Sequence, residues 1–323
     1  MKPARQTETW IIAANRDQER HLTLSDGRQL AYTDLGDPAG YPLVFGHGMP
    51  GSRLEGHFFH GRAMSHGFRI LTPDRPGIDK SAFRSRRTLL DYPDDIGQLM
   101  DALGLDRFCH IGWSSGSSRT LACGYALGSR MDLGICLSGY THFAEYEGAH
   151  PLLAATRWPG PMLARHSKLL FRVVAGIVTR LSRHYPGLYL RQAKQLISDE
   201  DQYILSTCSS DGLFKQDQLA CLNSGGRAIA TDLLTELEDW QFRLKEVHIP
   251  IWIYQGGKDP FIPVDYANHL ASHLRDADLT LMPDAGHLYP LTETFQDILF
   301  TRLRQHLQPS GNLHAPENRG NVG

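Results

Sequence analysis

The chain has 323 residues, of which 41% are hydrophobic, so it is long enough for one large domain or two smaller ones around a substantial core. Lys and Arg total 33 against 35 Asp and Glu, a net charge of −2. This balance lacks the global basic field that holds phosphate backbones or anionic lipid, and it argues against a nucleic-acid partner.

Cysteine usage and hydropathy bear on location. The five cysteines are odd in number and form no C-x-x-C pair, so we expect neither a disulfide framework nor a zinc knuckle, and a reducing, cytoplasmic location fits best. They are Cys109, Cys123, Cys136, Cys208 and Cys221. No export signal is visible near the N-terminus, and the apolar stretch Leu169–Leu181 is too short and too charged for a membrane span.

Short runs of β-forming residues that end at Gly or Pro predict eight strands. The first two runs alternate and flank the turn signal Ser25-Asp26-Gly27-Arg28, which predicts an antiparallel hairpin. Later runs are continuously apolar, as in strands covered on both faces, and helical patterns such as Leu89–Leu103 separate them. The predicted fold is therefore an α/β, mostly parallel eight-stranded sheet flanked by helices. The runs are His21–Leu24, Gln29–Thr33, Leu43–Phe45, Arg69–Thr72, Phe108–Ile111, Gly134–Leu137, Ile251–Tyr254 and Leu279–Met282.

A helical insertion is predicted between two of these strands. Residues 140–240 contain helical patterns at Leu163–Ser182, Leu188–Ser198, Asp199–Ser206 and Gln216–Leu234 without a convincing strand. We expect a core formed by residues 1–139 and 241–307, a helical cap at 140–240, and a flexible tail at 308–323. Any one aromatic residue of the cap is expected to be core packing more often than cavity lining. These aromatic residues are Trp158, Phe171, Tyr185, Tyr189, Tyr203 and Phe214.

The sequence Gly112-Trp113-Ser114-Ser115-Gly116 lies directly between a predicted strand and a predicted helix. This is the context of a G-x-S-x-G nucleophile elbow, in which a strained turn exposes the serine and the flanking glycines let strand and helix approach closely. The alternative interpretation is an ordinary Gly-rich turn between a strand and a helix, without a catalytic role. We expect Ser114 to be a nucleophile.

A serine nucleophile needs a histidine base and a carboxylate that orients it. Among 16 histidines, His287 follows the last predicted strand, at the sheet edge where Ser114 is expected. Asp259 follows the strand Ile251–Tyr254 and is the preferred acid. Asp265 is expected to begin a helix, and Asp284 is too close in sequence to His287 to reach its ring.

An oxyanion formed by serine attack needs preorganised N–H donors. The backbone N–H of Ser115 is one candidate. The other is that of Met49, in the glycine-rich loop that also contains His47 and Gly48, because Pro50 has no N–H. A glycine-rich turn without catalytic duty is the alternative.

These motifs together resemble the α/β-hydrolase fold superfamily, with a helical cap. The His-Gly loop, the Asp74-Arg75-Pro76-Gly77 loop, the serine elbow, the cap, the acid and the Gly-His base occur in that family's order. One departure is Asp79, where many relatives have a second glycine; Ser81 still matches. Serine rather than aspartate at position 114 also excludes haloalkane dehalogenase and epoxide hydrolase activities.

The resemblance implies a cofactor-free serine hydrolase, without a metal, that cleaves an ester or related acyl bond of a small, largely apolar substrate. C–C bond hydrolases, perhydrolase-like enzymes, amidases, thioesterases, lyases and small-molecule receptors share the fold. Motifs therefore leave the substrate open, and the oligomeric state is not readable from them.

Overall fold

The computed structural model describes residues 19–153, 156, 160–207 and 211–307. Its centre is one eight-stranded sheet in the order β1-β2-β4-β3-β5-β6-β7-β8. β1 and β2 form an antiparallel hairpin and β2 is antiparallel to β4, whereas all the remaining neighbours are parallel. All eight predicted strands and the predicted hairpin are confirmed. The strands are β1 Glu19–Thr23, β2 Gln29–Gly36, β3 Tyr41–Gly46, β4 Phe68–Pro73, β5 Phe108–Trp113, β6 Met131–Leu137, β7 Ile251–Gly256 and β8 Ala277–Met282.

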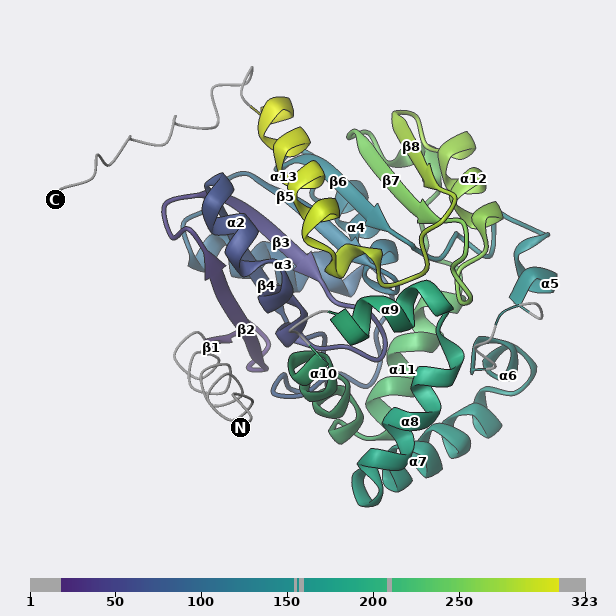
Figure 1. Ribbon diagram of the computed structural model, residues 1–323. Coiled ribbons are helices and arrows are strands. Elements are labelled where there is room, and N and C mark those ends of the chain that lie inside the picture. The colour runs from purple at the N-terminus through teal and green to yellow at the C-terminus, as the bar shows by residue number, and fades with distance from the viewer. Residues whose placement is uncertain (1–18, 154–155, 157–159, 208–210, 308–323) are drawn as a thin grey trace, which may run out of the picture.

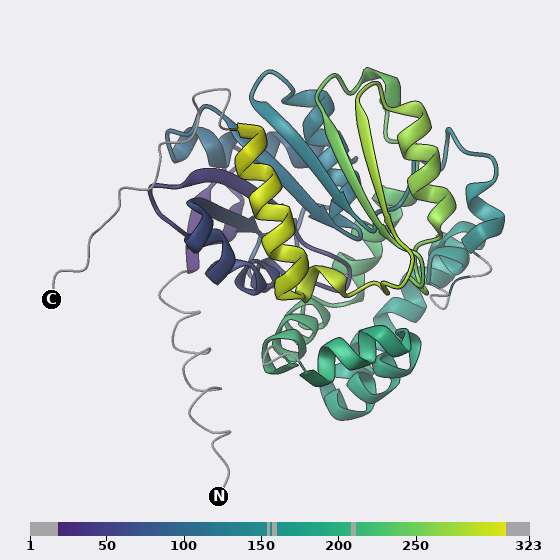
Figure 2. The same cartoon turned by 45° about the horizontal axis from the view of Figure 1, so that its top comes forward.

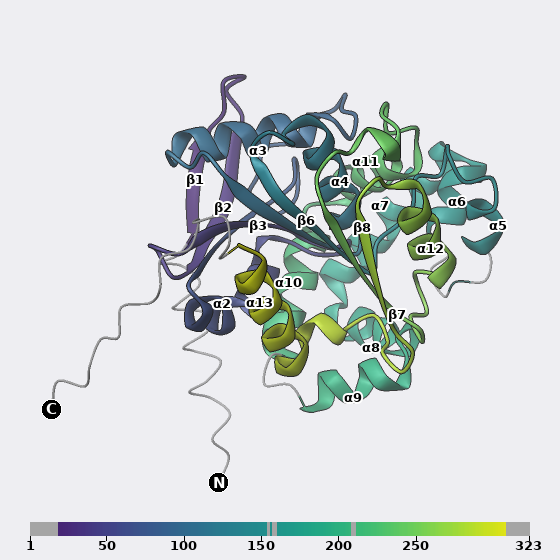
Figure 3. The same ribbon diagram turned by 90° about the horizontal axis from the view of Figure 1, so that it is seen from above.

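Helices cover both faces of the sheet, which is why the parallel strands lack alternation (Figure 3). One face packs against α3 (Asp91–Ala102), α4 (Gly116–Ala126) and α12 (Val264–His273). The other packs against α2 (His60–His66) and α13 (Glu293–Leu307), and α13 lies across the strands in Figure 2. The core is therefore two apolar layers, one on each side of the sheet.

A run of helices separates β6 from β7 in the sequence and lies at one end of the sheet (Figure 1). We call this run, α5 to α11, the helical insertion, and its described residues contain no strand. The helices are α5 Ala149–Leu153, α6 Gly160–His166, α7 Lys168–His184, α8 Pro186–Leu196, α9 Asp199–Thr207, α10 Asp211–Asn223 and α11 Gly226–Leu237. None of the described helices, in the insertion or elsewhere, is long and apolar enough to cross a membrane.

Two helix predictions in the insertion are wrong in the same way, because each joins two helices into one. The pattern Leu163–Ser182 is broken at Ser167, whose side chain caps α7 by accepting from the N–H of Leu170 at 3.2 Å. The pattern Gln216–Leu234 is broken at Gly225, which has a φ of +87°. Apolar spacing continues across both breaks and hides them. The tail 308–323, Trp158 and Cys208 lie outside the described residues.

Glycines at the ends of β3 and β5 position the first turn of α4. Gly46 and Gly112 are paired across the two strands. A Cβ on Gly116 would lie 2.0 Å from the carbonyl oxygen of Gly46, and one on Gly112 would lie 2.2 Å from that of Gly116. The helix therefore meets the sheet backbone to backbone.

We predict that Gly116→Ala lowers the free energy of unfolding by about 2 to 3 kcal/mol, because the added methyl group must displace backbone rather than a flexible side chain. Urea denaturation measures the change. Gly61→Ala is the control, since a Cβ at Gly61 in α2 would have no atom within 4 Å. Equal stability of the two variants would contradict the close-approach argument.

Candidate active site

Ser114 lies at the turn between β5 and α4, with a φ of +53°. Its N–H donates to the carbonyl of Leu137 at 2.8 Å, and its own carbonyl accepts from the N–H of Ser117 at 3.0 Å. Left-handed backbone is costly for serine, and the tight glycine contacts on both sides hold it there. Ser114 lines the main cavity, and within the described part of the chain its hydroxyl makes no hydrogen bond.

His287 and Asp259 form a short, buried pair. The Nδ1–H of His287 donates to Oδ2 of Asp259 at 2.6 Å, and the Asp259 side chain is fully buried. The other oxygen of Asp259 accepts from the N–H groups of Phe261 and Ile262 at 2.8 and 3.0 Å. The carboxylate is therefore fixed by three donors, and the Nε2 of His287 is left for another partner.

Two aromatic rings hold the imidazole of His287 in place. Trp113 stacks on it with ring centroids 5.9 Å apart, and its indole N–H donates to the carbonyl of His287 at 3.2 Å. Phe261 meets it edge-on, with centroids 5.2 Å apart. Burial alone would lower the pKa of His287, but the charge and hydrogen bond of Asp259 and the charge of Asp201 outweigh it and raise that pKa.

The other two carboxylates considered for the acid lie elsewhere. Asp265 is exposed in the first turn of α12. The side chain of Asp284 is 92% exposed and pairs with Lys258 at 3.2 Å. Neither contacts the ring of His287.

Asp201, in α9 of the insertion, is a buried site residue that the motifs do not reveal. Its carboxylate accepts from the N–H groups of His287 and Leu288 at 2.9 and 2.7 Å. A Cβ on Gly286 would lie 2.3 Å from Asp201 and from Ser198, so only glycine fits before the histidine. The spacing from Ser198 to Asp201 is a helix-start signal, and the two do bond across the first turn of α9. That signal carries no information about the distant loop that contains Gly286, His287 and Leu288, which we call the histidine loop.

The loop after β3 is fixed from both sides. Arg75 donates to the carbonyl of His47 and, at 2.8 Å, to that of Gly48, while Glu55 accepts the N–H of Gly48 at 2.8 Å. His47 is fully buried, donates from Nδ1 to the carbonyl of Gly48 at 2.8 Å and accepts the N–H of Arg75 at 3.2 Å. Burial lowers the pKa of His47 well below its ordinary value, so it stays neutral. The N–H groups of Met49 and Ser115 donate to none of the described residues.

Asp79, the departure from the family pattern, has the left-handed backbone that glycine adopts readily. Its φ is +39°, and its N–H donates to Ser224 at 2.7 Å. Its carboxylate pairs with Arg53, which also pairs with Asp74. Asp tolerates left-handed backbone better than most residues, so the substitution is accommodated.

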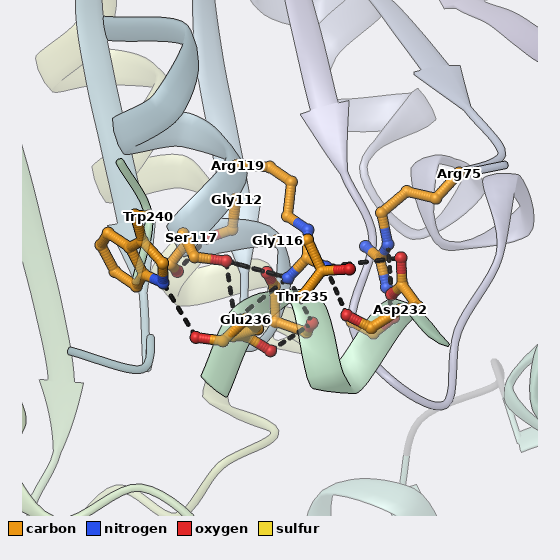
Figure 4. A network of polar contacts seen from close by, with 12 residues as sticks. Arg75, Gly112, Gly116, Ser117, Arg119, Asp232, Thr235, Glu236 and Trp240 are labelled. Atoms are coloured by element: carbon orange, nitrogen blue, oxygen red, sulfur yellow. Dashed lines mark hydrogen bonds and ion pairs between the residues drawn. The ribbon is translucent and has the colours of Figure 1, made fainter. Parts of the chain in front are cut away.

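A buried ionic network joins α11 to the elbow (Figure 4). Asp232 contacts three guanidinium groups, those of Arg75 and Arg87 at 2.8 Å and that of Arg119 at 3.4 Å. Although burial raises the pKa of Asp232, these three cations lower it far below its usual range. One turn later, Glu236 accepts from the hydroxyls of Ser115 and Ser118, each at 2.7 Å.

Two buried carboxyl groups, those of Asp217 and Glu55, contact the loop that contains Met49 and the residues just after it. Asp217, in α10, accepts from the N–H and hydroxyl of Ser52 at 2.8 and 2.6 Å, while its other oxygen has no described partner. Burial, opposed by the Ser52 hydrogen bonds, raises the pKa of Asp217 to about 8. Burial and the charge of Asp217 raise that of Glu55 as well.

The cavity above Ser114 is lined mainly by apolar side chains and has about 970 Å³ of space, its open mouth included. Its floor includes Met49, Trp113 and His287, and α8, α9 and α10 supply much of its wall. Of the aromatic residues named from the sequence, Tyr189 and Phe214 line it, Phe171 is buried within the insertion, and Tyr185 and Tyr203 are exposed. Among the described residues, no group of three or more His, Cys, Asp or Glu side chains is placed to hold a metal.

A family model for the alpha/beta hydrolase fold matches residues 41–294. The chain belongs to the alpha/beta hydrolase fold family. The match spans β3 to the start of α13, so it includes the elbow, the insertion and the histidine loop.

Individual members of this hydrolase family are only distantly similar. A non-heme chloroperoxidase from Streptomyces lividans is 38% identical over 100 residues, 29% of this chain and 35% of that protein. An uncharacterized hydrolase, YcgS from Bacillus subtilis, is 23% identical over 273 residues, 81% of this chain and 89% of that protein. A thermophilic esterase structure from Thermogutta terrifontis superimposes with a TM-score of 0.65 at 19% identity, covering 90% of this chain and 98% of that one. The structural likeness shows the shared fold.

We predict that Asp201→Asn lowers both the pKa of His287 and the free energy of unfolding, the latter by about 1 to 3 kcal/mol. An amide removes the negative charge and can offer an acceptor to only one of the two N–H groups. NMR titration of His287, assigned with a His287→Gln spectrum, and urea denaturation measure the two effects. Glu200→Gln is the control, because Glu200 is on the same helix and pairs outward with Lys258. An unchanged His287 titration in Asp201→Asn would contradict the argument.

Proposed function

We propose that this hydrolase is a cofactor-free serine esterase that cleaves an ester, or a related acyl bond, of a small and largely apolar substrate. The observation that carries the proposal is that Ser114 and the His287–Asp259 pair lie at one apolar cavity. Ser114 lies there on a strained turn, with its hydroxyl bound to none of the described residues, and the imidazole of His287 lies there with Nδ1 bound to the buried Asp259. The esterase among the structural neighbours agrees with this choice.

In the proposed mechanism, Ser114 Oγ attacks the acyl carbon while His287 Nε2 accepts the hydroxyl proton. The imidazolium is stabilised by Asp259 and then gives its proton to the leaving alcohol, as the bond from the acyl carbon to that alcohol breaks. A water molecule, activated by the same histidine, attacks the acyl-enzyme and releases the acid. The three donors to Asp259 hold its carboxylate in position beside the ring.

The N–H groups of Met49 and Ser115 are the proposed oxyanion donors. Arg75 binds the carbonyls of His47 and Gly48, and Glu55 accepts the N–H of Gly48. The N–H of Met49 has no partner among the described residues and is the group proposed to bind the substrate. Because buried hydrogen-bonding side chains hold this loop on both sides, the donors need little reorganisation when charge develops on the oxygen.

We further propose that residues 140–240 act as a cap over a core of residues 1–139 and 241–307. The support is that α8, α9 and α10 wall the cavity whereas the site residues Ser114, Asp259 and His287 lie on loops of the sheet. The cap would then select the substrate, a small molecule rather than a nucleic acid, and leave the chemistry to the core.

We expect a fluorophosphonate probe to label Ser114 and abolish hydrolysis of short p-nitrophenyl esters, because the probe reacts only with an activated serine. Mass spectrometry locates the label, and esters from acetate to palmitate report the acyl preference. Ser114→Ala should be unlabelled and inactive, whereas Ser65→Ala, at an exposed serine of α2, should behave as the parent. Folded protein without labelling would refute the nucleophile, and labelling without turnover of any ester would refute ester cleavage.

When kcat/KM for ester hydrolysis is plotted against pH, we expect the midpoint of the fall on the acid side to lie above 6.5, the ordinary pKa of histidine. Activity should fall as the pH falls through the raised pKa of His287, because imidazolium cannot accept the serine proton. In Asp259→Asn the limb should move to lower pH, since the charge that raises this pKa is gone, and kcat should fall by about 10⁴-fold. A pH profile of both proteins tests this. An unshifted limb in the variant would mean that Asp259 does not set the protonation of His287.

A further inference from the structure

Helix α7 presents a row of large apolar side chains to solvent. These residues are connected by spacings of three or four positions and therefore follow one side of the helix. Leu169 is 72% exposed and Tyr185, just past the end of the helix, 61%. We call the exposed apolar residues of this side the α7 face, and they are Leu169, Leu170, Val173, Ile177, Val178, Leu181 and Tyr185.

Packing of α7 against the rest of the insertion does not explain the exposed apolar row, because the residues on its buried side are mostly smaller. The helix packs against α11 through Phe171 and Ala175, and its other buried residues are Thr179 and Ser182, so three of the four are small or polar. Larger aliphatic residues thus point outward while smaller ones point inward, the reverse of an ordinary surface helix. In Figure 1, α7 lies at the lower edge of the insertion, and the sheet lies at its opposite side.

The charge of this part of the chain is strongly one-sided. From Gly160 to Ser198 there are seven basic residues and no Asp or Glu, although the whole chain has a net charge of −2. Helical spacing places the exposed Arg172 and Arg180 along one edge of the α7 face. Lys168 is paired with Glu238 outside this stretch. The basic residues are Arg165, Lys168, Arg172, Arg180, Arg183, Arg191 and Lys194.

We propose that the α7 face docks on an anionic lipid surface, with its apolar row at the boundary between headgroups and acyl chains and its arginines at the lipid phosphates. A helix with an exposed apolar side bordered by Lys and Arg is the chemistry that lies in such an interface. A second copy of this chain fits less well, because pairing two α7 faces would bring like-charged guanidinium groups together. The 17 residues of α7 give a contact about 25 Å long.

The proposed docking surface adjoins the cavity. α8 contributes Leu188, which is exposed near the α7 face, and the next residues, Tyr189 and Leu190, line the cavity wall. The proposal depends on the surface alone and does not rest on the proposed esterase activity. It can therefore be tested with Ser114→Ala protein, in which catalysis plays no part.

Flotation of the full-length Ser114→Ala protein with vesicles measures the docking. We expect binding to vesicles of equal parts phosphatidylcholine and phosphatidylglycerol that weakens with added salt, and little binding to phosphatidylcholine alone. Adding Val173→Asp and Ile177→Asp should abolish it. Adding Arg172→Gln and Arg180→Gln should weaken it about thirtyfold, from the loss of two charges near the surface. Both pairs are on the exposed side, so thermal unfolding should be unchanged.

Ile298→Asp is the matched control, because Ile298 in α13 is 57% exposed and distant in sequence from α7. It should bind vesicles as the parent does. Failure of the parent to bind the mixed vesicles would overturn the proposal, and so would equal loss of binding in Ile298→Asp. Sedimentation velocity that showed a dimer dispersed by Ile177→Asp would also overturn it, in favour of a second copy as the occupant.

Discussion

The placement of Asp232 among three guanidinium groups is the constraint on which the site depends most. Arg75 belongs to the loop after β4, Arg87 precedes α3, and Arg119 is in α4, so a single carboxylate on α11 joins three separate parts of the core. Removing one partner of such a buried network leaves a charge without compensation and costs several kcal/mol. Arg75 extends the constraint to the carbonyls of His47 and Gly48, and hence to the loop that contains Met49.

Acidic side chains fasten the helical insertion to the core at three places in the site. Glu236 binds the first turn of α4, Asp217 binds Ser52 just after the loop that contains Met49, and Asp201 binds the histidine loop. Apolar contacts alone could not set the orientation of these loops, since hydrophobic contact is not directional. The hydrogen bonds that these acidic side chains accept from N–H and hydroxyl groups are directional and fix the backbone.

The sheet and the motif residues were predictable because their signals are local. Gly or Pro marks the end of each strand, and the residues around Ser114, Asp259 and His287 follow predicted strands directly. The contacts of Asp201, Asp217, Asp232 and Glu236 were not predictable, because an acidic residue on an amphipathic helix normally faces water and only the fold brings these four to distant loops. The helix breaks at Ser167 and Gly225 were also missed, since apolar spacing runs through both.

The two neighbouring carboxyl groups of Glu55 and Asp217 take up protons when the chain folds at neutral pH. In the unfolded chain both would be ionised at neutral pH, near their ordinary pKa values of 4.5 and 3.8. In the folded protein both pKa values are raised, that of Asp217 to about 8, so the native state binds more protons. Their contribution to stability is complete below the unfolded pKa values and is lost as the pH rises toward about 8. Mild acid therefore tightens the attachment of α10 to the loop beside Ser114, and alkali loosens it.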